Sequence, residues 1–318
     1  MRGLMKAVQT IRAADTVLLG CHMNPDGDAI GSMVALGLGL KQLDKKVSMI
    51  CADPVPKMYA TLPGIDRVVR YVPVKKRFDL AVAVDCSYRH MLGEAQRAFE
   101  QAAAVMAFDH HLERDAFGPI DVIDKDAAAM AEVVYPILKK LRVKITRAIA
   151  ENLLTSIIVE TNSFRLSAVR ARTFRISAEL TRTGIDYSRL SERVYWAVKK
   201  EAALLMGVCL QRSQFMKGGQ LVWAYVRKRD FQKFGGRDED VDAVPDELRA
   251  IQGVKVVVFF RETKDGCLRI SLRSKKGINV AALARQYGGG GHYDVAGCLL
   301  ANTPRDRKQF LNKVAQLI

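Results

Sequence analysis

The first half of the sequence alternates short, uniformly apolar runs with segments of helical composition. Apolar runs of strand length lie at 17–21, 80–84 and 102–108, and residues 29–40 and 89–101 have helical composition. A strand without polar positions is typical of a strand buried on both faces, as in a parallel sheet. The alternation of such strands with helices predicts a doubly wound α/β fold.

Acidic and histidine side chains stand where these predicted strands end. They are His22, Asp26 and Asp28 for the first run, Asp85 for the second, and Asp109, His110 and His111 for the third. Parallel strands end at the same edge of a sheet, so we expect these loops to meet. Converging carboxylates and imidazoles repel or stay unpaired unless cations lie among them. Mixed donors of this kind suit Mn²⁺, Fe²⁺, Co²⁺ or Zn²⁺ better than Mg²⁺.

The first of these loops has a second interpretation. Pro25 and Gly27 are typical of a turn, and the carboxylates of Asp26 and Asp28 could cap the helix that follows. Taken alone, the loop favours neither interpretation. The convergence with Asp85 and the later histidines favours metal binding.

A different pattern begins at Gly218, where three predicted strands and a helix follow one another up to residue 286. We expect three parts: a catalytic domain over 1–190, a helical linker over 191–216, and a smaller α/β domain with a mixed sheet over 217–318. Residues 170–215 have a mostly helical pattern, and residues 196–215 are predicted to form a helix that links the two domains.

The C-terminal part also contains a candidate phosphate cradle. Consecutive glycines let backbone N–H groups approach an anion without obstruction by a Cβ, and a following histidine adds a donor. Arginine and serine on the preceding predicted strand offer further phosphate donors. A glycine run alone also fits a flexible loop. The predicted substrate-binding residues are Arg273, Ser274, Gly289, Gly290, Gly291 and His292.

Charge and composition narrow the class of protein. The net charge of +16 favours polyanionic partners and a phosphate-bearing substrate. No apolar run approaches the roughly 20 residues that span a bilayer, and the N-terminus lacks a signal-peptide pattern. The six cysteines are scattered and mostly apolar in context, as in a reduced protein. We therefore expect a cytoplasmic protein without membrane contact.

The motifs resemble those of one family. The loop 22–32, Asp85 after an apolar strand, and the triplet Asp109-His110-His111 are similar in order and spacing to the DHH phosphoesterase superfamily (RecJ-like). The loop 288–292, with Ala296-Gly297 after it, resembles the DHH-associated C-terminal domain. The pattern is most similar to the short bacterial nanoRNase/pAp-phosphatase type.

This resemblance implies two divalent metal ions, Mn²⁺ first, with Mg²⁺, Co²⁺ or Fe²⁺ as alternatives. It assigns one ion to His22, Asp26 and Asp85, and the other to Asp28, Asp85, His110 and Glu160. It also implies that His111 contacts the scissile phosphate and that Asp109 orients a histidine, so that Asp85, Asp109 and His111 are the predicted catalytic residues.

The implied activity is hydrolysis of short RNA oligonucleotides to mononucleotides. 3′-Phosphoadenosine 5′-phosphate (pAp) and linear dinucleotides such as pApA are further implied substrates. A manganese pyrophosphatase, a RecJ-like single-strand exonuclease and a non-enzymatic nucleotide- or RNA-binding protein remain as alternatives. A homodimer is left open.

The chain departs from the family pattern at two positions. Glu160 stands where the family usually has Asp, and Asn162 where it usually has Gly. The longer side chain must reach the ion from a different rotamer or a retracted backbone. Loss of the glycine leaves the geometry of this turn in doubt, and a weakened second metal site would favour the non-enzymatic alternative.

Overall fold

The computed structural model describes most of the chain. The described residues are 3–70, 77–111, 113–196, 198–263, 265–275, 277–291 and 293–318. The chain divides into two compact units, Met1–Ala197 (unit 1) and Val198–Ile318 (unit 2). Among the described residues, no helix combines the length and apolarity needed to cross a membrane.

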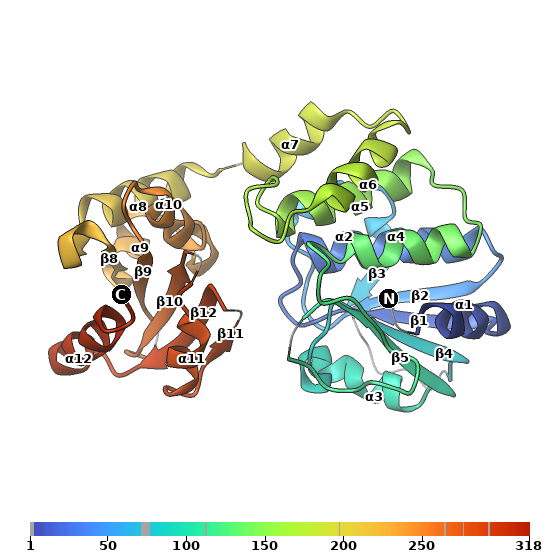
Figure 1. Ribbon diagram of the computed structural model, residues 1–318, viewed down its shortest axis with the longest axis horizontal. Helices are drawn as coiled ribbons and strands as arrows, with labels where there is room; N and C mark the ends of the chain where they lie inside the picture. The colour runs from blue at the N-terminus through green and yellow to red at the C-terminus, as the bar shows by residue number, and fades with distance from the viewer. Residues whose placement is uncertain are drawn as a thin grey trace. The chain divides into compact units, whose positions relative to one another are not determined.

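Unit 1 is built on a six-stranded parallel sheet (Figure 1). Its strands are β1 (Thr16–Gly20), β2 (Lys46–Cys51), β3 (Val68–Arg70), β4 (Leu80–Val84), β5 (Ala104–Asp109) and β6 (Val122–Ile123). The strand order is β3-β2-β1-β4-β5-β6, so the order reverses between β1 and β4. The carboxyl ends of strands at such a reversal are where open α/β sheets bind ligands.

Helices cover both faces of this sheet, which confirms the predicted doubly wound α/β fold. One face carries α1 (Leu4–Ala13), α2 (Gly27–Lys41), α4 (Ala131–Lys140), α5 (Arg147–Glu160), α6 (Ala171–Thr181) and α7 (Tyr187–Tyr195). The other carries α3 (Gln96–Glu100) and a 3₁₀ helix, Arg89–Ala95. Further 3₁₀ turns span Lys57–Tyr59 and Ile65–Arg67. All of β4 is buried, as its uniform apolarity predicts.

The helix predicted over residues 89–101 is wrong as a single element. Gly93 has φ 55° and ψ −137°, which interrupts the helical path. A Cβ at Gly93 would lie 3.0 Å from the sulfur of Met23, and the backbone N–H of Met23 donates to the carbonyl of Met91 at 2.7 Å. The break therefore lets this segment pack against the loop that carries His22.

Unit 2 contains a six-stranded mixed sheet in the order β11-β12-β10-β9-β8-β7, in which only the β8–β9 pair is parallel. The strands are β7 (Gln214–Met216), β8 (Leu221–Val226), β9 (Val256–Glu262), β10 (Leu268–Ser274), β11 (Gly290–Gly291) and β12 (Val295–Leu300). The helices are α8 (Lys200–Gln211), α9 (Lys228–Phe234), α10 (Val244–Ala250), α11 (Val280–Arg285) and α12 (Pro304–Ala315), with 3₁₀ turns Lys217–Gly219 and Asp238–Val241.

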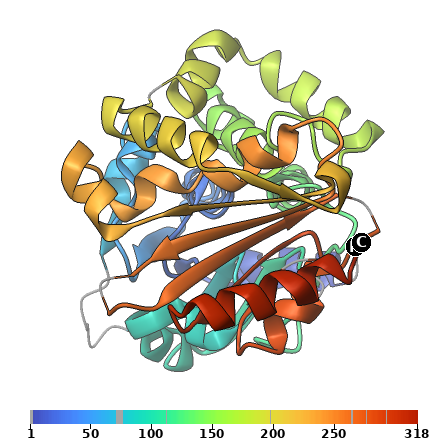
Figure 2. The same cartoon turned by 90° about the vertical axis from the view of Figure 1, so that its left-hand side faces the viewer.

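Two apolar cores hold these layers together. One lies between the sheet and α11 and α12, and the other between the sheet and α8 and α10. Figure 2 shows α12 on one face of the sheet and α8 and α10 on the other. The smaller α/β domain with a mixed sheet is therefore confirmed. The segment 191–216, predicted as a linker, contains α8, and α8 packs against the sheet of unit 2.

Candidate active site

Asp85 stands at the reversal point, one residue beyond β4. Its backbone N–H donates to the carbonyl of Phe108 at 2.9 Å, and its side chain is buried. The residue has φ 55°, a left-handed conformation that costs a non-glycine residue roughly 1–3 kcal/mol. Its Oδ1 has no hydrogen-bond partner among the described residues. A strained, buried carboxylate with an unpartnered oxygen is typical of a ligand-binding position.

Asp26 serves the helix that follows it. Its Oδ1 accepts hydrogen bonds from the backbone N–H groups of Asp28 and Ala29, at 2.9 and 3.0 Å, which makes Asp26 the N-cap of α2. The same oxygen lies 4.0 Å from Nε2 of His22. The two interpretations of this loop are therefore compatible, because one carboxylate caps the helix and also faces the histidine.

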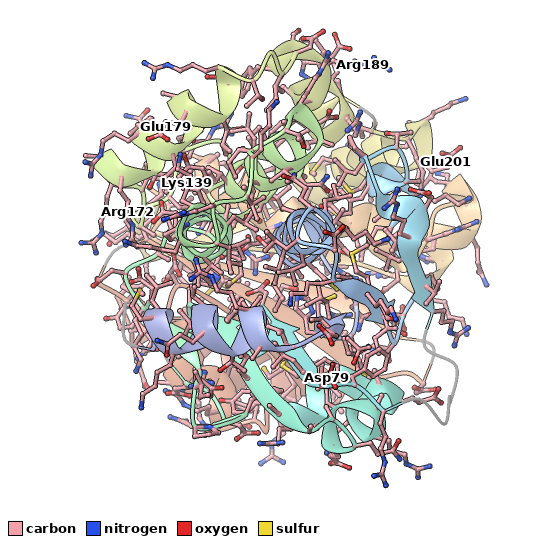
Figure 3. All side chains as sticks on the ribbon, turned by 90° about the vertical axis from the view of Figure 1, so that its right-hand side faces the viewer. Asp79, Lys139, Arg172, Glu179, Arg189 and Glu201 are labelled. Atoms are coloured by element: carbon pink, nitrogen blue, oxygen red, sulfur yellow. The ribbon has the colours of Figure 1, made fainter. Side chains whose placement is uncertain are left out.

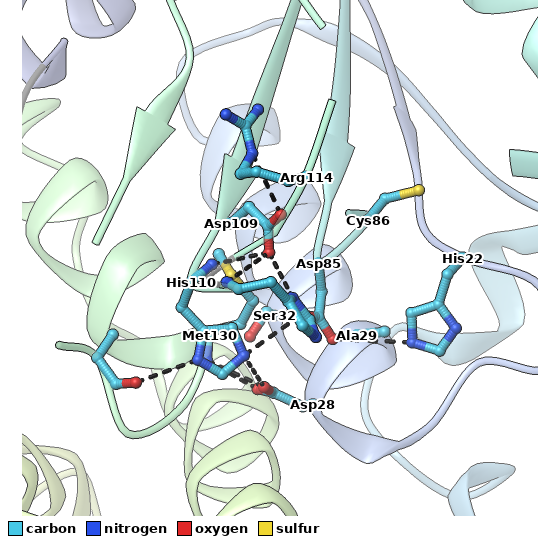
Figure 4. Close-up of polar contacts among 12 residues, drawn as sticks. His22, Asp28, Ala29, Ser32, Asp85, Cys86, Asp109, His110, Arg114 and Met130 are labelled. Atoms are coloured by element: carbon cyan, nitrogen blue, oxygen red, sulfur yellow. Dashed lines mark hydrogen bonds and ion pairs between the residues drawn. The ribbon is translucent and has the colours of Figure 1, made fainter. Parts of the chain in front are cut away.

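Two histidines each turn one ring nitrogen toward the carboxylates, as the ion pairs drawn in Figure 4 show, and their hydrogen bonds fix which nitrogen that is. Nδ1 of His22 lies 2.7 Å from the carbonyl of Met23, and Nδ1 of His110 lies 3.1 Å from the carbonyl of Ala127. Since a carbonyl only accepts, each Nδ1 carries the proton. Nε2 then lies 3.8 Å from Asp85 Oδ2 in His22 and 3.5 Å from Asp85 Oδ1 in His110. In the neutral ring that nitrogen presents a lone pair to a carboxylate, an arrangement that a cation between them would stabilise.

Ligand-capable atoms gather in three groups whose members lie within 4.8 Å of one another. We call the group of His22, Asp26 and Asp85 the outer cluster, and the group of Asp28, His110 and Glu160 the inner cluster. The third group, Asp85 with His110 and His111, joins the two. Together with the unpartnered oxygen of Asp85, this donor set fits divalent cations.

The electrostatics of the inner cluster also fit bound cations. Burial, and then the charge of Asp85, raises the pKa of Asp28 to about 6. Burial and the charge of Asp28 raise the pKa of Glu160 well above its usual range. Although burial opposes it, the neighbouring His110 and His111 lower the pKa of Asp85. Asp28 and Glu160 therefore tend to keep protons in the metal-free protein, and a bound cation would displace these protons.

His111 is held from behind by a buried carboxylate. Asp109 Oδ1 accepts from Nδ1 of His111 at 2.7 Å and from the backbone N–H of His110 at 2.8 Å. Arg114 lies on the far side of Asp109, with its Nε 3.4 Å from Oδ2, and also pairs with Asp121 at 2.6 Å. Asp109 and Arg114 therefore fix the orientation of the His111 ring, although neither belongs to any of the three groups of ligand-capable atoms.

Asp28 is held by a residue that sequence analysis missed. Its carboxylate accepts hydrogen bonds from the hydroxyl of Ser156, on α5, and from the backbone N–H of Met130, at the start of α4. Ser32 donates to the Ser156 hydroxyl at 3.1 Å. A Cβ at Gly31 would lie 2.4 Å from the carbonyl of Asn152, so the close packing of α2 on α5 needs this glycine. In the sequence, Gly31 is a recognisable sign of close helix packing, whereas a single serine inside a helix does not indicate that it binds Asp28.

Glu160 ends α5, and the turn after it keeps an unusual geometry. Asn162, Ser163 and Phe164 all have positive φ, at 45°, 55° and 64°. Asparagine adopts the left-handed region more readily than other non-glycine residues, which explains how the turn forms without the usual glycine. Glu160 itself lies within the inner cluster.

The predicted phosphate cradle lies in a hollow of about 850 Å³ in unit 2. Gly288 to Gly291, Arg269 and Arg273 line it. A Cβ at Gly289 would lie 2.1 Å from the carbonyl of Gly297, so the loop lies against β12 only because it lacks side chains. Asp246 accepts from Nε of Arg273 at 3.2 Å, which fixes the guanidinium in the wall of the hollow.

One residue predicted with this cradle does not join it. Ser274 is buried, and its hydroxyl donates to the carbonyl of Ile278 at 2.7 Å. Because that hydroxyl is inside the unit and already bonded, the prediction of Ser274 as a phosphate donor is corrected. His292 lies outside the described residues.

Two family models match the chain. The DHH family, N-terminal domain, matches residues 16–157, and the DHHA1 domain matches residues 218–318. The first match contains β1 to β6 with the loops of both clusters, except for Glu160. The second contains the glycine-lined hollow.

Curated relatives match over most of the chain. The bifunctional oligoribonuclease and PAP phosphatase NrnA of Thermus thermophilus is 31% identical over 292 residues, which cover 92% of this chain and 86% of that protein. The protein of the same name from Bacillus subtilis is 25% identical, covering 90% and 89%. An exopolyphosphatase-related protein from Bacteroides fragilis has the same fold, with a TM-score of 0.90 at 22% identity, covering 99% of this chain and 95% of that one.

Proposed function

This chain belongs to the DHH phosphoesterase family, and from that premise we propose that it hydrolyses short oligoribonucleotides to mononucleotides. We include pAp and linear dinucleotides among its substrates. The proposal rests mainly on one observation: the Nε2 atoms of His22 and His110 both point toward the carboxylate of Asp85. The names of the relatives from Thermus thermophilus and Bacillus subtilis support the choice of substrate.

We assign one divalent cation to the outer cluster and one to the inner cluster, with Asp85 shared between them. Mn²⁺ is the proposed ion, because its preferences include both imidazole and carboxylate ligands. When bound, such ions activate water as a nucleophile and neutralise charge on the phosphoryl group. The protein's part is to hold the ligands: the carbonyls of Met23 and Ala127 orient the two imidazoles, and Ser156 orients Asp28.

His111 is proposed to contact the scissile phosphate. Its Nδ1 is bonded to buried Asp109, whose negative charge favours the protonated imidazole, and the pKa of His111 is raised although burial opposes the shift. A protonated imidazole is a suitable partner for a phosphate oxygen. Asp109 therefore acts through His111, by fixing the ring and its charge.

The hollow of unit 2 is proposed to bind the terminal nucleotide of the substrate. Open space beside Gly290 leaves its backbone accessible to an anion, and Arg273 and Arg269 contribute positive charge to the wall. A site that holds one terminal phosphate favours short substrates.

A substrate panel with Mn²⁺ tests this function. The panel contains pAp, pApA, RNA of two to five nucleotides, long single-stranded DNA and pyrophosphate. We expect turnover of the first three. Preference for pyrophosphate would indicate the pyrophosphatase alternative, preference for long DNA the RecJ-like alternative, and tight RNA binding without turnover the non-enzymatic one.

A further inference from the structure

A stacked pair of phenylalanines lies on the surface of unit 1, close in the chain to the inner cluster. The rings of Phe164 and Phe174 are 5.2 Å apart at an interplanar angle of 18°. Phe164 is half-buried against the core, while Phe174, on α6, is 55% exposed. The pair offers a flat aromatic surface of the kind on which nucleic-acid bases stack.

The turn that presents Phe164 is strained. Three consecutive non-glycine residues, ending at Phe164, are in the left-handed region. The turn is closed by hydrogen bonds from Ser163 N–H to the Ile158 carbonyl at 2.8 Å and from Arg165 N–H to the Thr161 carbonyl at 2.9 Å. Strain of this kind persists at sites where a function requires the conformation.

Both partners of the aromatic pair are connected to ligands of the inner cluster. Phe164 follows Glu160 by four residues through this tight turn. On α6, the N-cap residue Arg170 pairs with Asp126 at 3.3 Å, and the neighbouring Ala127 holds His110 through its carbonyl. The turn after Glu160 and the N-terminus of α6 therefore connect the aromatic pair to residues of the inner cluster in the same unit.

The charge around the pair is strongly positive. Residues 163–182 contain five arginines and one glutamate. Arg165, Arg170 and Arg175 are exposed, and Figure 3 labels Arg172 and Glu179 on the same helix. An aromatic surface among exposed arginines is the combination that binds single-stranded nucleic acid, since bases stack on the rings and phosphates pair with the cations.

We propose that Phe174, supported by Phe164, stacks on the second nucleoside of an RNA substrate. This proposal rests on the proposed function, in which the first nucleotide occupies the hollow of unit 2. Since pAp contains one nucleoside and pApA contains two, the two compounds differ in whether they reach the aromatic pair.

Steady-state kinetics of Phe174→Ala on the two compounds tests the proposal. We expect KM for pApA to rise about tenfold with kcat unchanged, and both constants for pAp to stay the same. Phe174→Trp should retain the wild-type KM, and Phe174→Leu should behave like the alanine variant. Phe215→Ala is the matched control, because Phe215 is a similarly exposed phenylalanine (52%) in unit 2.

A dinucleotide that lacks its second base sharpens the test. Its KM should be the same for the wild type and for Phe174→Ala, because the stacking partner is absent. An unchanged KM for pApA in Phe174→Ala, or equal losses on pAp and pApA, would overturn the proposal. If the wild type hydrolyses neither compound, the proposed function fails, and equilibrium binding of pApA against pAp to the same variants still decides the stacking site.

Discussion

The outer and inner clusters share the same ligand chemistry but are built by different parts of the fold. In the outer cluster, the side chains of His22 and Asp26 are 15% and 47% exposed. In the inner cluster, the side chains of Asp28 and His110 are 0% and 8% exposed. In the outer cluster, Asp26 is held by hydrogen bonds within its own loop, whereas in the inner cluster Asp28 is held by the packing of α2 against α5.

The two clusters therefore differ in what determines the positions of their carboxylates. The position of Asp26 follows from an N-cap, which short-range sequence determines. The position of Asp28 depends on Ser156, which is 128 residues away in the chain. We therefore expect the outer cluster to respond mainly to changes in its own loop, and the inner cluster to changes in distant helices.

Asp85→Ala tests what the clusters share and should have the largest effect. Because Asp85 belongs to the outer cluster and is the ligand that we propose both ions share, we expect the bound metal to fall from two ions per chain to none or one weakly held ion. Activity should fall by more than about 10³-fold, since each ion contributes several kcal/mol to transition-state stabilisation. Metal analysis and kinetics measure both quantities. Asp66→Ala, at an exposed aspartate of unit 1, is the control; full Mn²⁺-dependent turnover in Asp85→Ala would contradict the shared-ligand assignment.

The sequence predicted the strands and the residues at their ends because both signals are local. An apolar run ending in Asp or His is visible without knowledge of the fold, and parallel topology then places the ends together. What it could not predict depended on long-range packing. Ser156 looks like any serine in a helix, and Ser274 looks like a donor until the structure shows its hydroxyl bonded to Ile278. The break at Gly93 brings this segment into contact with Met23, a residue far away in the chain that no local pattern connects with it.

Ser156→Ala should weaken the inner cluster alone. Without this hydroxyl Asp28 loses a hydrogen bond that orients it, and loss of such a partner typically lowers metal affinity by about 10–100-fold. Isothermal titration with Mn²⁺ should show one weakened and one unchanged site. Thr155→Val is the matched control, because it removes a buried hydroxyl from the adjacent position, where it donates to the Glu151 carbonyl on the same helix. Equal weakening of both sites would show that the clusters are not independent.

Asp26→Ala and Asp28→Asn should change the stability of the metal-free protein in opposite directions at pH 7. Loss of the N-cap should lower the free energy of unfolding by up to about 1 kcal/mol. Part of this loss is offset, because burial and Asp85 raise the pKa of Asp26 and its ionisation also opposes folding. Asp28→Asn should raise it by about 1 kcal/mol, because the raised pKa of Asp28 means that ionisation opposes folding. The cost of that charge is fully present above pH 6 and absent below about pH 4, where Asp28 is protonated in both states.

Denaturant unfolding in the presence of a chelator, at pH 7 and at pH 4, measures both effects. The gain from Asp28→Asn should disappear at the lower pH, while the loss from Asp26→Ala should remain in part because a protonated Asp26 can still accept a hydrogen bond. A gain from Asp28→Asn that persists at pH 4 would point to packing as its cause.

Glu160→Asp should have the smallest effect, confined to the inner cluster. The backbone after Glu160 is fixed by the left-handed turn of residues 162–164, so the shorter carboxylate cannot follow by shifting the chain. It is withdrawn from Asp28 and His110 by one methylene, about 1.5 Å. We expect the affinity of the inner ion to fall by less than about tenfold, which is about 1.4 kcal/mol. Glu151→Asp is the control, because it shortens a carboxylate on the same helix that pairs with Arg193. An unchanged Mn²⁺ titration in Glu160→Asp would show that a carboxylate of either length binds the inner ion, and a loss of that ion would show that the length of Glu160 is essential in this chain.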